Sequence, residues 1–231
     1  MLSGRYVEVQ MLPLSFSEYA EYMGGSHGDL KAVFNNYVKF GSFPYIATLV
    51  KEGSDVKGYL DGIYNTILIK DVAVREGIND IAVLESIVKF LCSCIGSPIS
   101  AKKVSDTINS SGRRISVNTV ERYMRALCDS YIFHKCDRYD IKGRQLLKTL
   151  GKYYIVDVGL REILVSSSAS DTGHLLENIV YLELLRRGYK VNIGKLAEKE
   201  VDFVASDEEG LCYYQVSASV LDESTLAREL E

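Results

Sequence analysis

The residues with the clearest chemistry in this sequence are clustered arginines and lysines. Residues 100–150 contain 11 basic and 5 acidic residues, a net charge of +6, whereas the formal net charge of the whole chain is -4. Guanidinium and ammonium groups bind phosphate oxygens, so a basic segment in an otherwise acidic protein indicates one surface that faces a polyanion. These basic side chains fall into three groups: Arg113 with Arg114, Arg122 with Arg125, and Lys142 with Arg144.

Hydrophobic spacing predicts the elements that position these side chains. Helices are expected over 80–95, 100–108 and 116–130, followed by extended runs over 131–139 and 145–150. Three helices and a hairpin, in this order, are typical of a winged helix-turn-helix, whose third helix enters the major groove of duplex DNA. The arginines would contact phosphates, whereas Asn118 and Thr119 at the helix start could reach base edges. The alternative is a winged helix that binds protein or only packs within the fold.

Cysteine, histidine and hydropathy patterns exclude several other classes of protein. Only Cys92 and Cys94 lie close together, and no second pair has zinc-ligand spacing, so we expect reduced, buried thiols and no metal site. The three histidines are too scattered for zinc or nucleophilic chemistry. The longest run without a charged residue is 12, short of the roughly 20 apolar residues of a membrane helix. We therefore expect a soluble, cytoplasmic protein with no membrane partner.

The remaining segments predict a mixed α+β fold. Residues 5–14 alternate as a strand, and Ser15 followed by Glu18 forms a capping box that starts a short helix. Further helices are expected over 29–40, 55–75, 171–187 and 221–231, and further strands over 152–157, 189–193, 200–205 and 211–218. The segment 206–210 joins the last two strands as a hairpin turn, and 166–170 is a polar link.

Six short motifs then occur in a recognisable order. They are Ser3-Gly-Arg-Tyr-Val-Glu8, Leu12-Pro-Leu-Ser-Phe16, Gly41-Ser-Phe-Pro44, Lys152-Tyr-Tyr-Ile-Val-Asp157-Val-Gly159-Leu160, Leu176-Glu-Asn178 with Tyr181-Leu-Glu-Leu184, and Glu200-Val-Asp-Phe-Val204. In this order they resemble the C-terminal two thirds of bacterial and archaeal AAA-type P-loop ATPases that end in a domain of unknown function. The resemblance covers essentially the whole chain.

The resemblance implies four parts. They are a remnant of the ATPase core over 1–25, a helical lid-like segment over 26–79, the winged helix over 80–150, and a C-terminally truncated domain of the restriction-endonuclease-like (PD-(D/E)XK) type over 151–231. The chain contains no Gly-x-x-x-x-Gly-Lys-Ser/Thr, so it has no backbone cradle for nucleotide phosphates and we expect no ATPase activity. ATP and Mg²⁺ are expected only for the missing core, and no cofactor is expected on this chain. Arg5 would lie near nucleotide as a sensor or finger residue, or else be an ordinary surface arginine.

The resemblance also implies the position of a nuclease-like site. Such sites hold Mg²⁺ with carboxylates and place a lysine near the attacked phosphate. Glu177 matches the helix carboxylate and Asp202 the strand carboxylate, but the third element contains Gln215 and Ser217 where the family has an acid and a lysine. Residues 171–231 also have a net charge of -7, which repels DNA.

These observations predict a non-catalytic C-terminal region that binds duplex DNA and carries a degenerate nuclease-like site. Two alternatives stay open. One is a metal-dependent nuclease that uses Glu177 and Asp202. The other is an interaction scaffold that binds a protein partner or a second copy of itself without binding DNA.

Overall fold

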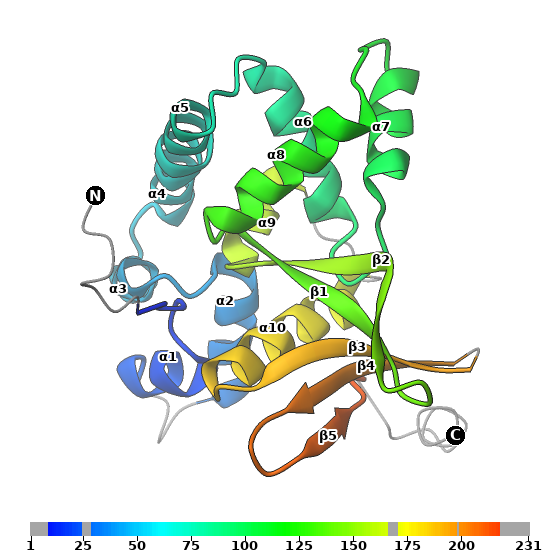
Figure 1. Cartoon of the computed structure of the whole chain (residues 1–231). Coiled ribbons are helices and arrows are strands. Elements are labelled where there is room, and N and C mark those ends of the chain that lie inside the picture. The colour runs from blue at the N-terminus through cyan, green and yellow to red at the C-terminus, as the bar shows by residue number, and fades with distance from the viewer. Residues whose placement is uncertain (1–8, 25–28, 166–170, 198, 218–231) are drawn as a thin grey trace.

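The computed structural model describes residues 9–24, 29–165, 171–197 and 199–217 and shows a mixed α+β fold (Figure 1). The helices are α1 (Phe16–Tyr22), α2 (Leu30–Phe40), α3 (Pro44–Glu52), α4 (Val56–Ile63), the π-helix η1 (Tyr64–Asp71), α5 (Val72–Arg75), α6 (Ile81–Ser93), α7 (Ala101–Ser110), α8 (Val117–Asp129), α9 (Val158–Leu164) and α10 (Thr172–Arg186). The strands are β1 (Phe133–Asp140), β2 (Gln145–Ile155), β3 (Lys190–Leu196), β4 (Lys199–Ser206) and β5 (Leu211–Tyr214). Within these ranges, no helix combines the length and apolar character needed to cross a membrane.

Short polar side chains define where most of the helices begin. The Ser15 hydroxyl accepts a hydrogen bond from the Glu18 N–H, and the Glu18 carboxylate accepts one from the Ser15 N–H at 2.7 Å, so the predicted capping box is confirmed. Side-chain oxygens cap six further helices: Asp29 for α2, Asp55 for α4, Asp80 for α6, Ser100 for α7, Ser116 for α8 and Asp157 for α9. These caps satisfy N–H groups that have no partner inside the helix.

The helices agree with the sequence pattern except in three places. Residues 44–52 form α3, which the pattern did not predict, with Pro44 at its start and Gly53 in the left-handed conformation at its end. The helix predicted over 55–75 is present, but its middle is the π-helix η1. Residues 158–164, for which the pattern predicted no helix, form α9. The predicted helix over 221–231 and the link over 166–170 lie outside the described residues.

The five strands form one sheet in the order β2-β1-β3-β4-β5. Neighbouring strands are antiparallel except β1 and β3, which are parallel. Strand β2 continues from Gln145 to Ile155, across the predicted boundary between residues 150 and 151. The hairpin predicted as a wing and the strands predicted for a separate C-terminal domain therefore belong to the same sheet, since hydrogen bonds between β1 and β3 join them.

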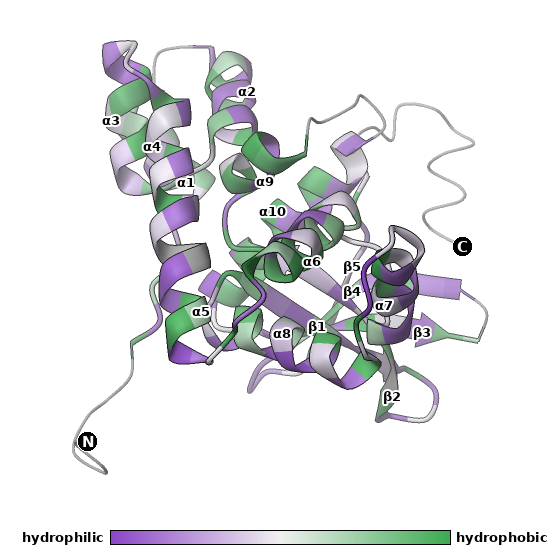
Figure 2. Ribbon diagram, turned by 90° about the horizontal axis from the view of Figure 1, so that it is seen from above, coloured by the Kyte–Doolittle hydropathy of each residue, from purple (hydrophilic) through white to green (hydrophobic). Residues whose placement is uncertain are grey.

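One face of this sheet packs against α10, and the larger core lies among the helices. Tyr154 of β2, Tyr181 of α10 and Phe203 of β4 meet between the sheet and α10, with the Tyr154 and Tyr181 rings stacked at 4.3 Å. In the helical half, α6 is largely hydrophobic along its length (Figure 2) and buries Leu84 and Leu91 completely. The apolar stripe of α6 follows the helical spacing predicted from the sequence.

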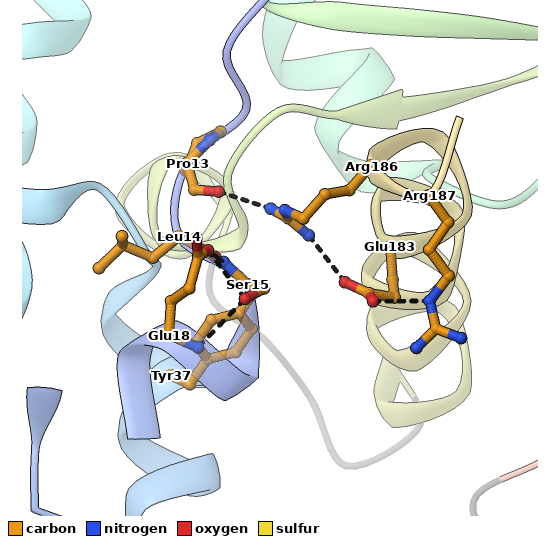
Figure 3. A network of polar contacts seen from close by, with 8 residues as sticks. All are labelled: Pro13, Leu14, Ser15, Glu18, Tyr37, Glu183, Arg186 and Arg187. Carbon is orange, nitrogen blue, oxygen red and sulfur yellow. Dashed lines mark hydrogen bonds and ion pairs between the residues drawn. The ribbon is translucent and has the colours of Figure 1, made fainter. Parts of the chain in front are cut away.

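Of the strand predicted over 5–14, residues 9–14 form no strand, and residues 5–8 lie outside the described residues. Residues 9–14 are irregular and are bound by side chains from two helices (Figure 3). The Tyr37 hydroxyl donates a hydrogen bond to the Leu14 carbonyl at 3.1 Å, and the Arg186 guanidinium donates one to the Pro13 carbonyl. Glu183 accepts hydrogen bonds from Arg186 at 2.9 Å and from Arg187 at 2.8 Å, so it helps to hold Arg186 in place beside residues 9–14.

Two of the motifs quoted above meet at the junction between α2 and α9. The buried Asp157 carboxylate accepts hydrogen bonds from the Ser42 N–H at 2.6 Å and from the Gly159 N–H at 2.8 Å. A Cβ atom at Gly159 would lie 2.1 Å from the Phe40 carbonyl oxygen, and Gly41 has a φ of 85° that favours glycine. The glycines in these motifs therefore allow two chain segments to pack backbone against backbone.

Candidate functional site

Three elements bring a buried lysine and three acidic side chains together. Lys152 of β2 is 3% exposed, and its Nζ atom lies 2.9 Å from the Glu177 Oε1 atom and 2.8 Å from the Glu200 Oε1 atom. Asp202 lies close enough that the charges of Glu177, Lys152 and Glu200 all influence the pKa of its carboxyl group. We call Lys152, Glu177, Glu200 and Asp202 the acid–lysine cluster.

A β-bulge places both acidic residues of β4 on the side that faces α10. Opposite β3, Asn192 pairs with Val204 and Gly194 pairs with Val201, which leaves two residues of β4 against one of β3. Val201 and Val204 consequently share the outer face, because a Cβ atom added to Gly194 would lie 2.8 Å from each of them. Without the bulge, strict alternation would turn Phe203 away from the aromatic residues it packs against.

The surroundings of Lys152 keep it charged. Burial lowers the pKa of Lys152, but the carboxylates of Glu177 and Glu200 outweigh this effect, so its pKa is raised overall. Glu177 also accepts a hydrogen bond of 2.6 Å from the Tyr154 hydroxyl. Burial and the Glu177 charge raise the pKa of Tyr154, so its hydroxyl stays protonated and acts as a donor.

The three residues predicted for a degenerate nuclease-like site lie in one neighbourhood. The Gln215 side-chain oxygen accepts a hydrogen bond from the Asp202 N–H at 3.3 Å, and an Asp202 oxygen accepts one from the Val216 N–H at 2.8 Å. Burial raises the pKa of Asp202, and the bond from Val216 partly offsets the effect. The sequence predicted one strand over 211–218, but β5 ends at Tyr214. Residues 215–217 therefore lie just beyond the end of this strand.

Two positively charged side chains form ion pairs with carboxylates of the cluster. Besides Lys152, the Arg138 guanidinium lies 3.9 Å from Glu200. Among the residues that the structure describes, no three His, Cys, Asp or Glu side chains are grouped so that they could hold a metal ion. The sequence interpretation missed Lys152, although period-two alternation in β2 would have placed it on the same face as Tyr154.

The basic residues predicted to contact DNA lie on α8, the loop before it and the β1–β2 turn. Asn118, Arg122 and Arg125 are exposed on α8, and the guanidinium of Arg122 lies 5.4 Å from the centre of the Tyr123 ring. Positions three and four apart share one face of a helix, so these three side chains form a row. Thr119 is half-buried, and its hydroxyl lies 2.9 Å from that of Ser116.

The other predicted cations are also exposed. Arg113 and Arg114 lie in the loop before α8, where Arg113 is 3.9 Å from Asp80. Lys142 and Arg144 lie in the turn between β1 and β2, which Asp140 shapes by accepting a hydrogen bond from the Lys142 N–H. Arg5 lies outside the described residues.

Sequence comparison places this chain among proteins of unknown function. Residues 31–171 match the family described as "Domain of unknown function (DUF8612)". An uncharacterized protein of Haemophilus influenzae is 36% identical over 222 residues, which cover 95% of this chain and 55% of that protein. An uncharacterized protein of Methanocaldococcus jannaschii is 28% identical over 223 residues, covering 90% of this chain and 49% of that protein. The chain thus spans about half the length of these curated relatives, and no solved structure matches it.

Proposed function

The chain belongs to the DUF8612 family, a domain family of unknown function, and we propose that it binds duplex DNA through α8 and the β1–β2 hairpin. The observation that carries this proposal is the exposed row of Asn118, Arg122 and Arg125 on α8. Such a row suits phosphate contacts by the arginines and one base contact by the amide.

The order and pairing of the surrounding elements support a winged helix-turn-helix. Helices α6, α7 and α8 precede the hairpin, and an antiparallel bridge joins Ile99, between α6 and α7, to Gly151 of β2. The Ile99 N–H donates to the Gly151 carbonyl at 2.9 Å. This bridge ties the hairpin to the helices, so that α8 and the hairpin would approach DNA as one rigid unit.

Salt dependence tests the proposal directly. Fluorescence anisotropy with a labelled duplex should show affinity falling steeply between about 50 and 200 mM salt, because each phosphate contact releases counterions. Contacts from all six predicted cations would give a log–log slope of roughly -5. An affinity unchanged over this range would contradict the proposal and favour the protein-interaction scaffold.

A matched pair of double variants locates the surface. Arg122→Ala with Arg125→Ala should weaken binding to all duplex sequences by about 10-fold or more and should lower the salt slope by about 2. Lys31→Ala with Lys57→Ala removes two exposed cations from α2 and α4 and should leave the slope unchanged. Equal losses in both double variants would show that only net charge matters.

A second candidate function is metal-dependent cleavage of nucleic acid at the acid–lysine cluster. It is favoured by the meeting of Glu177 and Asp202 around a lysine, which would replace the lysine lacking at Ser217. Plasmid DNA incubated with Mg²⁺ or Mn²⁺ should then be nicked by the wild type and left intact by Asp202→Ala. The non-catalytic alternative is supported because Lys152 is already paired with Glu177 and Glu200 and is not free to contact a phosphate.

The resemblance to AAA-type ATPases remains a proposal about the longer relatives. The half of each relative that this chain does not match would contain the nucleotide-binding core, with ATP and Mg²⁺ as its cofactors. A Gly-x-x-x-x-Gly-Lys-Ser/Thr motif in that half would support the proposal, and its absence from both proteins would contradict it.

A further inference from the structure

A cavity of about 460 Å³ lies between the start of α7, one side of α8, and strands β1 and β2. Its apolar wall consists of Ile99, Met124 and Leu150, and its polar lining includes Arg125, Lys135 and Tyr153. A cavity of this size that combines an apolar wall with convergent polar groups is typical of small-ligand sites. The acid–lysine cluster lies apart from it, because Lys152 and Tyr154 face α10 whereas Tyr153 faces α8.

Tyr153 supplies a polar group of the cavity that is available to a ligand. The residue is 7% exposed, yet its hydroxyl makes no hydrogen bond to any part of the chain that the structure describes. Burial raises the pKa of Tyr153, and the charges of Asp137 and Glu121 add to this effect, so the hydroxyl stays protonated and can donate a hydrogen bond. The hydroxyl is not completely enclosed by protein, so a ligand in the cavity can reach it and form a hydrogen bond with it.

The cavity is rich in hydrogen-bond donors. Arg125 supplies an exposed guanidinium, and Lys135 supplies an ammonium that lies 2.6 Å from Asp137. The ten-residue helix α7 begins here, and Ser100 caps only the N–H of Lys103. The N–H groups of Ala101 and Lys102 in the first turn therefore have no intrahelical partner, and the helix dipole favours an anion beside them.

We propose that this cavity binds a phosphate group carried on an organic ligand. Arg125, the start of α7 and the Tyr153 hydroxyl would hold the phosphate oxygens, and the attached base or sugar would lie against Ile99, Met124 and Leu150. Glu121, on the rim, would accept a hydrogen bond from the organic part. The phosphate belongs either to a free mononucleotide or to the DNA backbone, and the proposal does not depend on duplex binding.

Isothermal titration calorimetry with three probes tests the proposal on the full chain. Adenosine monophosphate should bind more tightly than inorganic phosphate, and adenosine without phosphate should bind at least 10-fold more weakly than the monophosphate. Tyr153→Phe removes one hydroxyl and should weaken binding of the monophosphate about 3- to 10-fold, the effect of one hydrogen bond. Arg125→Gln should weaken it further, because it removes a charge-assisted contact.

Tyr19→Phe is the matched control, because it also removes one tyrosine hydroxyl that has no partner among the described residues, but in the cluster of α1 and α2. It should leave binding unchanged. If adenosine monophosphate gives binding heat with the wild type and Tyr153→Phe reduces it, the phosphate belongs to a free ligand. If the monophosphate does not bind but Tyr153→Phe weakens duplex binding, the phosphate belongs to DNA. If Tyr153→Phe changes neither binding reaction, the proposal is wrong, whether or not the wild type binds duplex.

Discussion

The acid–lysine cluster and the α8 surface use the same kinds of charge in opposite ways. In the cluster, Lys152 is 3% exposed and is held by two carboxylates at 2.9 and 2.8 Å. On α8, Arg122 and Arg125 are exposed, and no ion pair to them occurs among the described residues. Cations that are already paired inside the fold are not available to a polyanion, whereas exposed, unpaired cations are.

This contrast separates charge that maintains the structure from charge that is free to bind. Removing one member of a buried pair leaves an uncompensated charge, which is costly. Removing an exposed arginine costs little stability but can cost much affinity for nucleic acid.

Lys152→Met should cause the largest loss of stability. It keeps the length of the side chain but leaves Glu177 buried without its cation, which typically costs about 3–5 kcal/mol. Urea denaturation would measure the loss. Lys142→Met, at the exposed turn between β1 and β2, is the matched control and should change stability by less than about 0.5 kcal/mol.

A double variant shows whether the loss comes from the unpaired charge. Lys152→Met with Glu177→Gln removes the buried carboxylate as well, so stability should recover in large part. If the double variant is no more stable than Lys152→Met, the lysine acts through its packing and not through its charge, and the electrostatic side of the contrast would be wrong.

Gly159→Ala should destabilise the fold by about 1–3 kcal/mol without changing any charge. A Cβ atom there would lie 2.1 Å from the Phe40 carbonyl oxygen, so the α2–α9 junction must separate. Gly62→Ala in α4 is the matched control, since a Cβ atom at Gly62 meets no atom within 4 Å. That change should be neutral or stabilising by up to about 1 kcal/mol. Equal melting temperatures for the two variants would contradict the close packing.

The pH dependence of stability should also depend on Lys152. Its carboxylate partners raise its pKa in the fold above the value of about 10.4 in the unfolded chain. The contribution of the ion pairs is therefore complete below about pH 10 and is lost as the pH rises through the folded-state pKa. Urea midpoints measured in alkaline buffers should fall more steeply for the wild type than for Lys152→Met, which retains every tyrosine. If the urea midpoints of the two proteins fall in parallel as the pH rises, the ion pairs of Lys152 do not contribute to the pH dependence of stability.

The sequence predicted the helices well because their signals are local. The apolar spacing of 81–93 and the Ser15 capping box involve residues within a few turns of one another, and both are confirmed. The π-helix at 64–71 was missed because its apolar residues also fit an ordinary helix. The strand was predicted over 5–14 from the alternation of Val7 and Val9 with polar neighbours, but tertiary contacts to Tyr37 and Arg186 hold residues 9–14 in an irregular conformation.

The candidate site could be predicted only in part because its contacts are long-range. Glu177 and Asp202 were predicted as site residues from a family resemblance. Lys152 was not predicted, because it lies 25 residues before Glu177 and no local pattern joins the two. The parallel pairing of β1 with β3 was equally invisible, since β2, α9 and α10 separate them in the chain. That pairing is what places the predicted domain boundary at 150/151 inside a continuous sheet.

Arg122→Ala with Arg125→Ala should have the smallest effect on stability, less than about 1 kcal/mol, most of it from the loss of Arg122 over the Tyr123 ring. The contrasting arginine is Arg161, which is 2% exposed and donates from its Nε atom to the Cys92 carbonyl at 2.9 Å. Arg161→Ala should lower the melting temperature by several degrees, because a buried carbonyl and the Asp171 carboxylate lose their donor. If the double variant at 122 and 125 melts at a temperature as low as Arg161→Ala does, then Arg122 and Arg125 also stabilise the fold. Loss of duplex binding could then no longer be attributed to missing phosphate contacts.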